Sequence, residues 1–477
     1  MTMQENELVF KSGRALGSMI RTKEISPVEV VEAYLDRIEQ LNPKVNSFIT
    51  ILRDESMAKA RRAESEIQAG RYIGPLHGLP YAPKDILATA GHRTTNGSDV
   101  TKDNVTHHES TITDKLNKAG AIMVGKLAMS PFAMGNAVLT SFGNARNPWH
   151  LDYSPAGSSS GSGASLAAFM VPLAIGTDTG GSIRGPASAN GIVGLKQTYG
   201  RVSRYGVTTL SWTLDNAGPM TKTVADNANM LQAIAGHDPM DPATTNDPVP
   251  DYSQALTGNV EGLRIGLPTN YFFENTDPEA VRAVQEAVRS LVDMGATTVD
   301  VDVPHADLAG AALWIIAMSE AACFHEKRIR EDWDQFDPQI QRELGGAMFY
   351  TATDYIKANR VRSILQREME QVFRQCDVMA VPGSQNKPRK LQTPDEARAS
   401  FDEIAPSTPR RGNTAIGNMT GYPAMVIPCG MFSGSPTFPI TLQLYAKPFD
   451  EFTLFRTAHA YESVTDWHEQ RAPLAGS

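Results

Sequence analysis

The clearest periodic pattern near the start of the chain is an apolar stripe at helical spacing. Within Ser26–Leu41, apolar residues recur every three or four positions, as on one face of an amphipathic helix. Ser26 and Glu29 have the spacing of a capping box, and Pro27 suits the first helical turn. The predicted inward face consists of Val31, Leu35, Ile38 and Leu41. Similar patterns predict helices over 8–21, 51–69, 278–294, much of 308–375, and 450–465.

Short uninterrupted apolar runs form a second pattern and predict buried strands. The runs lie at 121–127, 169–178, 262–268, 297–304, 376–383, 423–430 and 439–446. They alternate with the predicted helices, and 262–304 has the order strand, helix, strand. Strands that are apolar throughout are typical of a sheet covered on both faces. We therefore predict an α/β protein with a central sheet between helical layers.

The charge balance narrows the choice of partner. Forty-four basic against fifty-three acidic residues give a formal net charge of −9, with no basic run of five or more. Such a chain is a poor binder of nucleic acid or of an anionic membrane, so we expect neither as a partner. The opening MTMQENELVF lacks the basic and apolar regions of a secretory signal. The three cysteines are widely spaced and the histidines are scattered, so we expect a cytoplasmic protein without a metal or other cofactor.

Two segments rich in serine and glycine hold the candidate chemistry. They are SPAGSSSGSGAS, which contains Ser158, and GTDTGGSIRGPA, which contains Ser182. Upstream, GLPYAPKDI presents Lys84 after an apolar approach. A serine nucleophile needs a base, and a neutral lysine can supply one. Deprotonating an ordinary lysine at pH 7 costs roughly 4.6 kcal/mol, a cost that burial lowers.

Together these segments resemble the amidase signature family. The resemblance rests on GLPYAPKD, GKLAMSPFAMG, NPWHLDYSPAGSSSGSGASLAA, GTDTGGSIRGPASANGIVGLKQTYGRVS and GPMTKTVADNANML, and continues more weakly to the end of the chain. It implies a Ser–Ser–Lys triad: Ser182 is the nucleophile, Ser158 the bridging serine after a cis peptide bond, and Lys84 the base. It also implies an amidase-signature fold with a twisted, mixed central sheet.

The same resemblance explains the glycines beside Ser182. It implies that the backbone N–H groups of Thr179, Gly180, Gly181 and Ser182 form the oxyanion hole of the tetrahedral intermediate. Paired glycines let the backbone approach the substrate closely. Removing one donor from such a hole typically costs on the order of 10²–10³ in rate.

Further residues receive supporting roles from the resemblance. Those expected to hold the loops in shape are Asp178, Arg184 and Ser159. Those expected to contact substrate are Met134, Gly135 and Asn136. Other pocket walls are expected from 311–330, from the polar stretch 384–408, which we interpret as a surface loop or lid, and from 413–418. The aromatic residues there, Trp314, Phe324 and Phe401, would suit an aryl or alkyl substrate.

The resemblance covers nearly the whole chain and implies one amidase domain over 1–477. Its parts are a helical layer at about 5–70, a catalytic core at about 71–235, and a C-terminal α/β portion with pocket loops at about 260–470. The sequence departs from the family pattern at Ala156, Ser160 and Gln197. All three triad positions are present, which disfavours a non-catalytic binding protein built on the same scaffold.

The implied activity is hydrolysis of amide C–N bonds through a seryl acyl-enzyme. Family members also cleave esters and carbamates (urethanes), so we expect a small-molecule amide, carbamate or ester as substrate and a monomer or homodimer as the active form. The main alternative is a family relative, the A subunit of glutamyl-tRNA amidotransferase, which makes ammonia from glutamine for a partner.

A second alternative is an α/β-hydrolase. GSSSG at 157–161 matches the G-x-S-x-G elbow, with Ser159 as nucleophile and His459 or His468 as its base. That enzyme needs a strand directly before the elbow, whereas the preceding NPWHLDYSPA contains two prolines.

Overall fold

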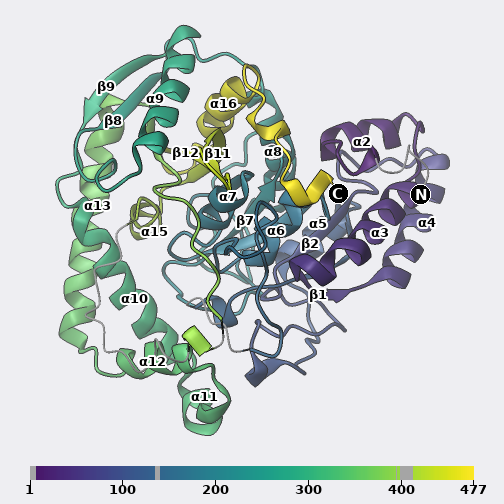
Figure 1. Cartoon of the computed structure of the whole chain (residues 1–477), viewed down its shortest axis with the longest axis horizontal. Helices are drawn as coiled ribbons and strands as arrows, with labels where there is room; N and C mark the ends of the chain where they lie inside the picture. Colours follow the sequence, from purple (N-terminus) through teal and green to yellow (C-terminus); the bar gives the residue numbers. More distant parts are fainter. Residues whose placement is uncertain (1–6, 135–139, 394, 398–411, 477) are drawn as a thin grey trace.

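A twisted ten-stranded sheet runs through the centre of the molecule (Figure 1). The computed structural model describes residues 7–134, 140–393, 395–397 and 412–476. The strands of the large sheet are β2 Pro80–Pro83, β3 Ile122–Met123, β5 Leu173–Asp178, β6 Val193–Lys196, β7 Asn216–Thr221, β8 Arg264–Pro268, β9 Thr297–Val301, β10 Val378–Pro382, β11 Ala424–Met431 and β12 Pro439–Ala446. Their order is β3-β2-β5-β7-β6-β11-β12-β10-β8-β9.

The sheet is mixed, as predicted. Strands β3, β2 and β5 are parallel at one end, and β10, β8 and β9 are parallel at the other. Between them β7, β6, β11 and β12 pair antiparallel with their neighbours. Most of these strands are buried along their whole length, which agrees with their apolar sequences.

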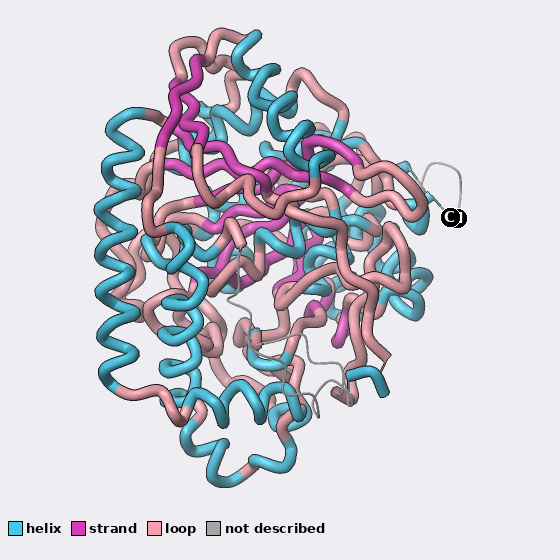
Figure 2. Tube along the Cα trace, turned by 60° about the vertical axis from the view of Figure 1, so that its left-hand side comes forward, coloured by secondary structure: helices cyan, strands magenta, loops and turns pink. Residues whose placement is uncertain are grey.

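Helices cover both faces of the sheet (Figure 2). The helices are α2 Gly13–Arg21, α3 Pro27–Val45, α4 Arg53–Gln68, α5 Thr111–Lys118, α6 Ser160–Ala167, α7 Arg184–Asn190, α8 Val224–Ile234, α9 Pro278–Asp293, α10 Ala309–Phe324, α11 Glu326–Glu331, α12 Pro338–Ala347, α13 Ala352–Gln375, α15 Ala415–Thr420 and α16 Glu451–Glu462. Helices α8 and α9 each contact α16, and the three helices pack on β6, β7, β11 and β12. Helices α6 and α7 also contact each other and pack against these central strands, on the other side.

The predicted helix at 26–41 forms as α3 and extends to Val45. Its capping box is present: the Ser26 hydroxyl accepts a hydrogen bond from Val28 N–H, and Glu29 accepts one from Ser26 N–H. Its apolar face is buried against the rest of the N-terminal layer, which includes α4. The neighbouring helix α2 begins at Gly13 rather than at residue 8, because Ser12 caps it by accepting from Ala15 N–H.

Four strands, β1, β2, β6 and β7, were absent from the prediction. Strand β2 contains two prolines, β6 contains a glycine, and β7 contains a glycine and a proline, so none of them shows a long apolar run. Strand β1, Phe48–Ile51, pairs with β4, Gly125–Leu127, in a separate two-stranded sheet. The predicted strand at 121–127 is therefore two short strands, β3 and β4, that belong to different sheets.

The most apolar helix is α10. Residues 306–324 are long and apolar enough to cross a membrane by length and composition, although a buried core helix passes the same test. More than half of this segment is buried, where α10 packs on α12, α13 and α15 (left side of Figure 1). Packing inside the protein therefore accounts for its composition.

Candidate active site

Lys84 follows β2 and reaches into the protein interior. Strand β2 pairs in parallel with β5, and Lys84 N–H donates to the Ile175 carbonyl at 3.0 Å. This register brings the side chain beside the end of β5. There the Lys84 Nζ atom lies 2.7 Å from Ser158 Oγ and 2.8 Å from Thr177 Oγ1. Strand pairing thus brings Lys84 beside Thr177, 93 positions away in the chain, and Ser158 meets the same amine from the turn before α6.

The surroundings of Lys84 favour its neutral form. The side chain is fully buried, and this burial lowers the pKa of Lys84 from its ordinary value of 10.5 to about 7. Its neighbour in sequence, Asp85, does not offset this effect as an ion-pair partner. The Asp85 carboxylate instead pairs with buried Lys126 at 2.9 Å and accepts from Thr95 N–H. A substantial fraction of Lys84 is therefore an unprotonated amine near neutral pH.

Ser158 stands on a backbone turn between the lysine and the 176–187 segment. The Gly157–Ser158 peptide bond is cis, as the family resemblance implies. The Ser158 carbonyl accepts from Ser130 N–H at 3.0 Å, and the next residue, Ser159, donates its N–H to the Ser182 carbonyl at 3.3 Å. These bonds hold the bridging-serine candidate between the base candidate and the loop that carries Ser182.

Ser182 lies on the turn from β5 into α7. Ser182, Gly180 and Gly181 are partly exposed, whereas Lys84 and Ser158 are buried. Among the described residues, no acceptor takes up the N–H groups of Gly180 or Ser182, so both are available to a substrate oxygen. Gly181 N–H is already engaged: it donates to Asp178 Oδ1 at 2.7 Å. Of the predicted oxyanion donors, Gly181 is therefore the one whose backbone N–H already donates a hydrogen bond within the described part of the protein.

The backbone conformation at position 181 strongly favours glycine. Its φ is +126°, a region that other residues rarely adopt. A Cβ at this position would lie 2.5 Å from Thr414 Oγ1. That hydroxyl has its own role in the loop, because it donates to the Gly180 carbonyl at 2.8 Å. The glycine thus permits a close approach of α15's N-cap residue to the Ser182 loop.

A buried ion pair stabilises the Ser182 loop on the side that faces the protein interior. Asp178 and Arg184 are fully buried, and the Arg184 Nε atom lies 3.0 Å from Asp178 Oδ2. Asp178 also accepts from the backbone N–H of Ile183 and from Asn418 Nδ2. The arginine, together with these hydrogen bonds, holds the pKa of Asp178 well below its usual range despite burial. Both side chains therefore face the protein rather than the substrate side.

The side chain of Ser159 is hydrogen-bonded to the backbone of β5. Its buried hydroxyl donates to the Thr177 carbonyl at 3.2 Å and accepts from Thr177 N–H at 3.1 Å. The two histidines that an α/β-hydrolase would need are elsewhere: His459 is on α16 and His468 is in the segment after it. The elbow alternative therefore has no free hydroxyl at Ser159, and neither histidine considered as its base lies in the segments that surround Ser159 among the described residues.

The expected pocket walls adjoin the loop in part. Met134 is buried in a segment that touches the Ser158 turn through Ser130, while Gly135 and Asn136 lie outside the described residues. On α10, Leu313 faces the loop, 3.1 Å from where a Cβ of Gly180 would lie. Phe324 packs edge-on against Trp212, with ring centroids 6.0 Å apart.

The polar loop at 384–408 is described only in part, and Phe401 falls outside. Its described portion is anchored next to the Ser158 turn. Lys390 pairs with Tyr153, and Ser154 N–H donates to the Arg389 carbonyl at 2.9 Å. The loop therefore borders the segment that leads to Ser158.

Sequence reasoning missed a polar chain that starts at the loop. Thr179 Oγ1 donates to buried Asp215 at 2.6 Å, and burial raises the pKa of Asp215 to about 6. Asp215 also accepts from Ser211 N–H, and the Ser211 hydroxyl donates to Glu320 on α10. No local motif marks these residues, because they meet only when α10 packs beside the loop. In the described part of the chain, no cluster of three or more His, Cys, Asp or Glu side chains could hold a metal ion.

Curated relatives and solved structures resemble this chain along nearly its whole length. The A subunit of glutamyl-tRNA(Gln) amidotransferase from Geobacter metallireducens is 40% identical, over 96% of this chain and 98% of the relative. The same subunit from Chloroflexus aurantiacus is 41% identical, over 98% and 99%. Among solved structures, a bacterial aryl acylamidase of the amidase signature family has a TM-score of 0.86 and 25% identity, over 96% and 97%. The A subunit from Thermotoga maritima has a TM-score of 0.74 and 29% identity, over 92% of each chain.

These relatives contradict the expected partners. We expected a small-molecule substrate, no nucleic acid, and no partner beyond a second copy of the chain. The relatives' names instead describe a subunit of an enzyme named for a tRNA. The expectation rested on the net charge of this chain, and the charge of a single chain does not determine what an assembly of several chains binds.

The family itself is shown by the match to a family model. The model described as Amidase matches residues 29–455, which include Lys84, both serines and the glycine-rich loop. Two solved structures share the fold of this chain, with TM-scores of 0.87 and 0.86. The chain belongs to the amidase family, the amidase signature enzymes.

Proposed function

We propose that this chain is the A subunit of a tRNA-dependent amidotransferase and that it hydrolyses the side-chain amide of glutamine. The ammonia released would serve partner proteins that act on glutamyl-tRNA. The observation that supports the hydrolytic step is the 2.7 Å hydrogen bond between buried Lys84 and Ser158, next to the Ser182 loop. The assignment to glutamine and to a complex is supported by the relatives named for this A subunit, which match 96–98% of the chain.

In the proposed first step, Ser182 Oγ attacks the carboxamide carbon. Its proton passes to Ser158, whose own proton passes to the neutral Lys84 amine. The carbonyl becomes an oxyanion that the N–H groups of Gly180 and Ser182 stabilise. When the C–N bond breaks, the proton returns through the same relay to the nitrogen, and ammonia leaves.

In the proposed second step, water attacks the acyl-enzyme ester. The relay removes a proton from the water and returns one to Ser182 Oγ. The sum is glutamine plus water giving glutamate plus ammonia. Lys84 starts and ends each cycle as a neutral amine, which fits a pKa of about 7 better than the ordinary lysine value.

The polar chain beyond Thr179 supports a charged amino-acid amide over an apolar one. Glu320 ends that chain on α10, and its carboxylate accepts from Thr213 Oγ1 at 2.8 Å. Arg362 on α13 donates to the same Thr213 hydroxyl at 2.9 Å, and its buried Nε has no hydrogen-bond partner among the described residues. Glu320 itself is held by Ser211, Thr213 and Tyr355, so the unpartnered Arg362 Nε is the group of this chain that would complement the carboxylate of an amino acid.

The test is ammonia release by the purified chain, alone and together with the other subunits of the host's amidotransferase. We expect release from glutamine, a rise when partners and glutamyl-tRNA are added, and none from Ser182→Ala. Ser159→Ala is the matched control, because that serine neighbours the relay but is bound to β5. Cleavage of anilides, esters or carbamates without any release from glutamine, alone or in the complex, would overturn the assignment.

A further inference from the structure

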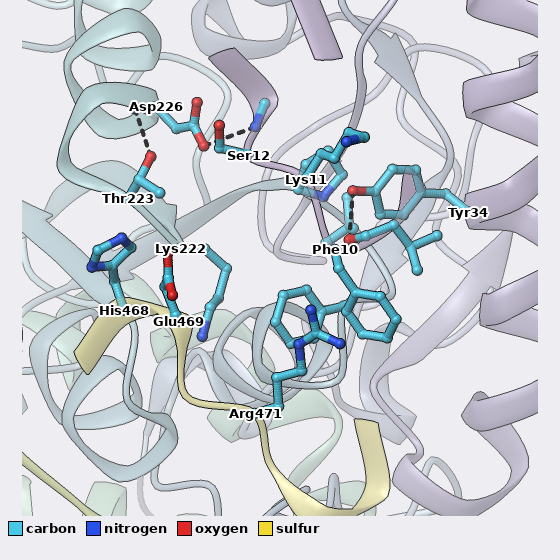
Figure 3. Close-up of a pocket in the computed structure, with 15 residues that line it drawn as sticks. Phe10, Lys11, Ser12, Tyr34, Lys222, Thr223, Asp226, His468, Glu469 and Arg471 are labelled. Atoms are coloured by element: carbon cyan, nitrogen blue, oxygen red, sulfur yellow. Dashed lines mark hydrogen bonds between the residues drawn. The ribbon is translucent and has the colours of Figure 1, made fainter. Parts of the chain in front are cut away.

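A second cavity lies away from the candidate active site. It has a volume of about 400 Å³ and is lined by the start of α2, the start of α8, the turn before β5, and the segment 468–471 (Figure 3). None of Lys84, Ser158 or Ser182 lines it. It adjoins the opposite ends of β5 and β7 from the Ser182 loop, roughly 20 Å away for six residues at about 3.3 Å each.

Positive charge gathers around two aromatic rings at this cavity. The Lys222 ammonium lies 5.0 Å from the centre of the Phe169 ring, and the Arg471 guanidinium lies 3.9 Å from the centre of the Phe10 ring. Arg37 approaches the same Phe10 ring at 5.1 Å. Figure 3 shows Arg471 and Lys222 reaching toward the same space.

In the described part of the chain, no acidic side chain forms an ion pair with these cations. Among the described residues, no carboxylate lies within 4.0 Å of the charged groups of Arg37, Lys222 or Arg471. Lys222 is only 8% exposed, yet its ammonium makes one long hydrogen bond, 3.4 Å to the Gln470 carbonyl. Burial and the charge of Arg471 lower the pKa of Lys222 to about 8. A buried lysine normally has its N–H donors paired with acceptors, and among the described residues Lys222 has only the Gln470 carbonyl.

The nearby acids are already engaged elsewhere. Asp226 accepts from the N–H groups of Gly13 and Arg14, and so caps the first turn of α2. Glu462 accepts from Val224 N–H at the start of α8, and burial raises the pKa of Glu462 to about 8. Glu469 stands at the exposed rim. The interior of the cavity therefore keeps an excess of positive charge.

We propose that this cavity binds a phosphate monoester, with Lys222 and Arg471 holding the phosphate. A dianionic phosphate would supply the acceptors that these cations lack, and an arginine fork matches its oxygens. The buried Nδ1 of His468, which has no hydrogen-bond partner among the described residues, offers a further polar contact on the lining. The volume exceeds that of phosphate alone and lies in the range of small-molecule sites, which leaves room for the esterified group.

A bound ester would join elements that are far apart in the sequence. The start of α2, the end of β7 at Lys222 and the C-terminal segment at Arg471 would all contact one ligand. Strands β5 and β7 lead from this site to the Ser182 loop, since Leu173 pairs with Thr221 and Asp178 pairs with Asn216. The proposal concerns binding alone and does not depend on the proposed glutaminase activity.

The experiment is calorimetric titration of the full-length chain with glycerol 3-phosphate, adenosine monophosphate, inorganic phosphate and sulfate. We expect at least one ester to bind more tightly than either inorganic anion. Lys222→Met should weaken that ester at least tenfold, and Arg471→Gln, at the exposed rim, provides a second variant that leaves the buried packing intact. Lys102→Gln, which removes an exposed charge outside the cavity, is the matched control and should bind like the wild type.

Three results would overturn the proposal. They are an absence of binding by both esters, equal affinity for esters, phosphate and sulfate, and an ester affinity that neither Lys222→Met nor Arg471→Gln changes. Circular dichroism of each variant establishes that a loss of binding is not a loss of fold. Because the readout is heat of binding, failure of glutamine hydrolysis leaves this test unaffected.

Discussion

Replacing Gly181 by alanine tests whether the shape of the Ser182 loop is required for activity. Holding alanine at a φ of +126° costs of order 1–3 kcal/mol. The new Cβ would also lie 2.5 Å from Thr414 Oγ1, so Thr414 or the loop must move. That movement breaks the 2.8 Å hydrogen bond to the Gly180 carbonyl, worth about 0.5–1.5 kcal/mol. We expect a total loss of about 2–4 kcal/mol in the free energy of unfolding.

The same displacement should affect catalysis. The oxyanion donors at 179–182 would shift together, and loss of one such donor typically lowers kcat on the order of 10²–10³-fold. Gly185→Ala is the matched control. Gly185 is in α7, its nearest neighbour to a new Cβ is the Gly157 carbonyl at 3.9 Å, and alanine favours a helix.

Urea denaturation and steady-state ammonia release measure the two effects. Gly181→Ala should lose both stability and kcat, whereas Gly185→Ala should remain within about 1 kcal/mol of the wild type and retain its kcat. If the two alanine variants behave alike in both assays, the explanation from φ and from the close approach of Thr414 is wrong.

Four further predictions concern charge and hydrogen bonding at the site. Since only neutral Lys84 can accept the proton, kcat/KM should fall about tenfold per pH unit below about pH 7, and Lys84→Ala should lack this limb. The pKa of Lys84 in the folded protein lies below its unfolded value of about 10.4, so the unfolded chain binds more protons between about pH 7 and 10.4. The free energy of unfolding of the wild type, relative to that of Lys84→Met, should therefore rise with pH in that window. A difference that does not change with pH would argue against burial of the amine. Ser159→Ala should cost about 1–3 kcal/mol in urea denaturation, because Thr177 N–H loses its acceptor, yet keep kcat within about tenfold; complete loss would revive the elbow alternative. Arg184→Met should destabilise the fold by about 3–5 kcal/mol, because it leaves Asp178 buried without its partner. The double variant Arg184→Met with Asp178→Asn should recover part of that loss. An undiminished loss of stability in the double variant would contradict the ion-pair explanation.

The elements that the sequence predicts well are those with strong local signals. Helix α3 has a capping box and a regular apolar face, and β8, α9 and β9 form a parallel β-α-β unit from three clear patterns. Strands β6 and β7 lack such signals, because their stability comes from pairing with β5 and β11 rather than from their own composition.

In the candidate site, too, some features have a local sequence signal and others depend on contacts between distant segments. Lys84, Ser158 and Ser182 follow from short segments that resemble the family signature, but the burial of Lys84 depends on the pairing of β2 with β5. Thr414 contacts Gly180 across 234 residues of sequence, a separation that no local pattern reveals. The partner prediction was wrong for a different reason, since it applied the charge of one chain to a possible complex.

Ser182 as the nucleophile of an acyl-enzyme is the claim on which the proposed mechanism depends most. Rapid-quench mass spectrometry of the wild type, with glutamine and separately with a p-nitrophenyl ester, identifies the acylated residue whichever substrate reacts. We predict an acyl group on Ser182, and neither adduct nor turnover in Ser182→Ala. An adduct on Ser158 or Ser159, or undiminished turnover by Ser182→Ala, would contradict this mechanism.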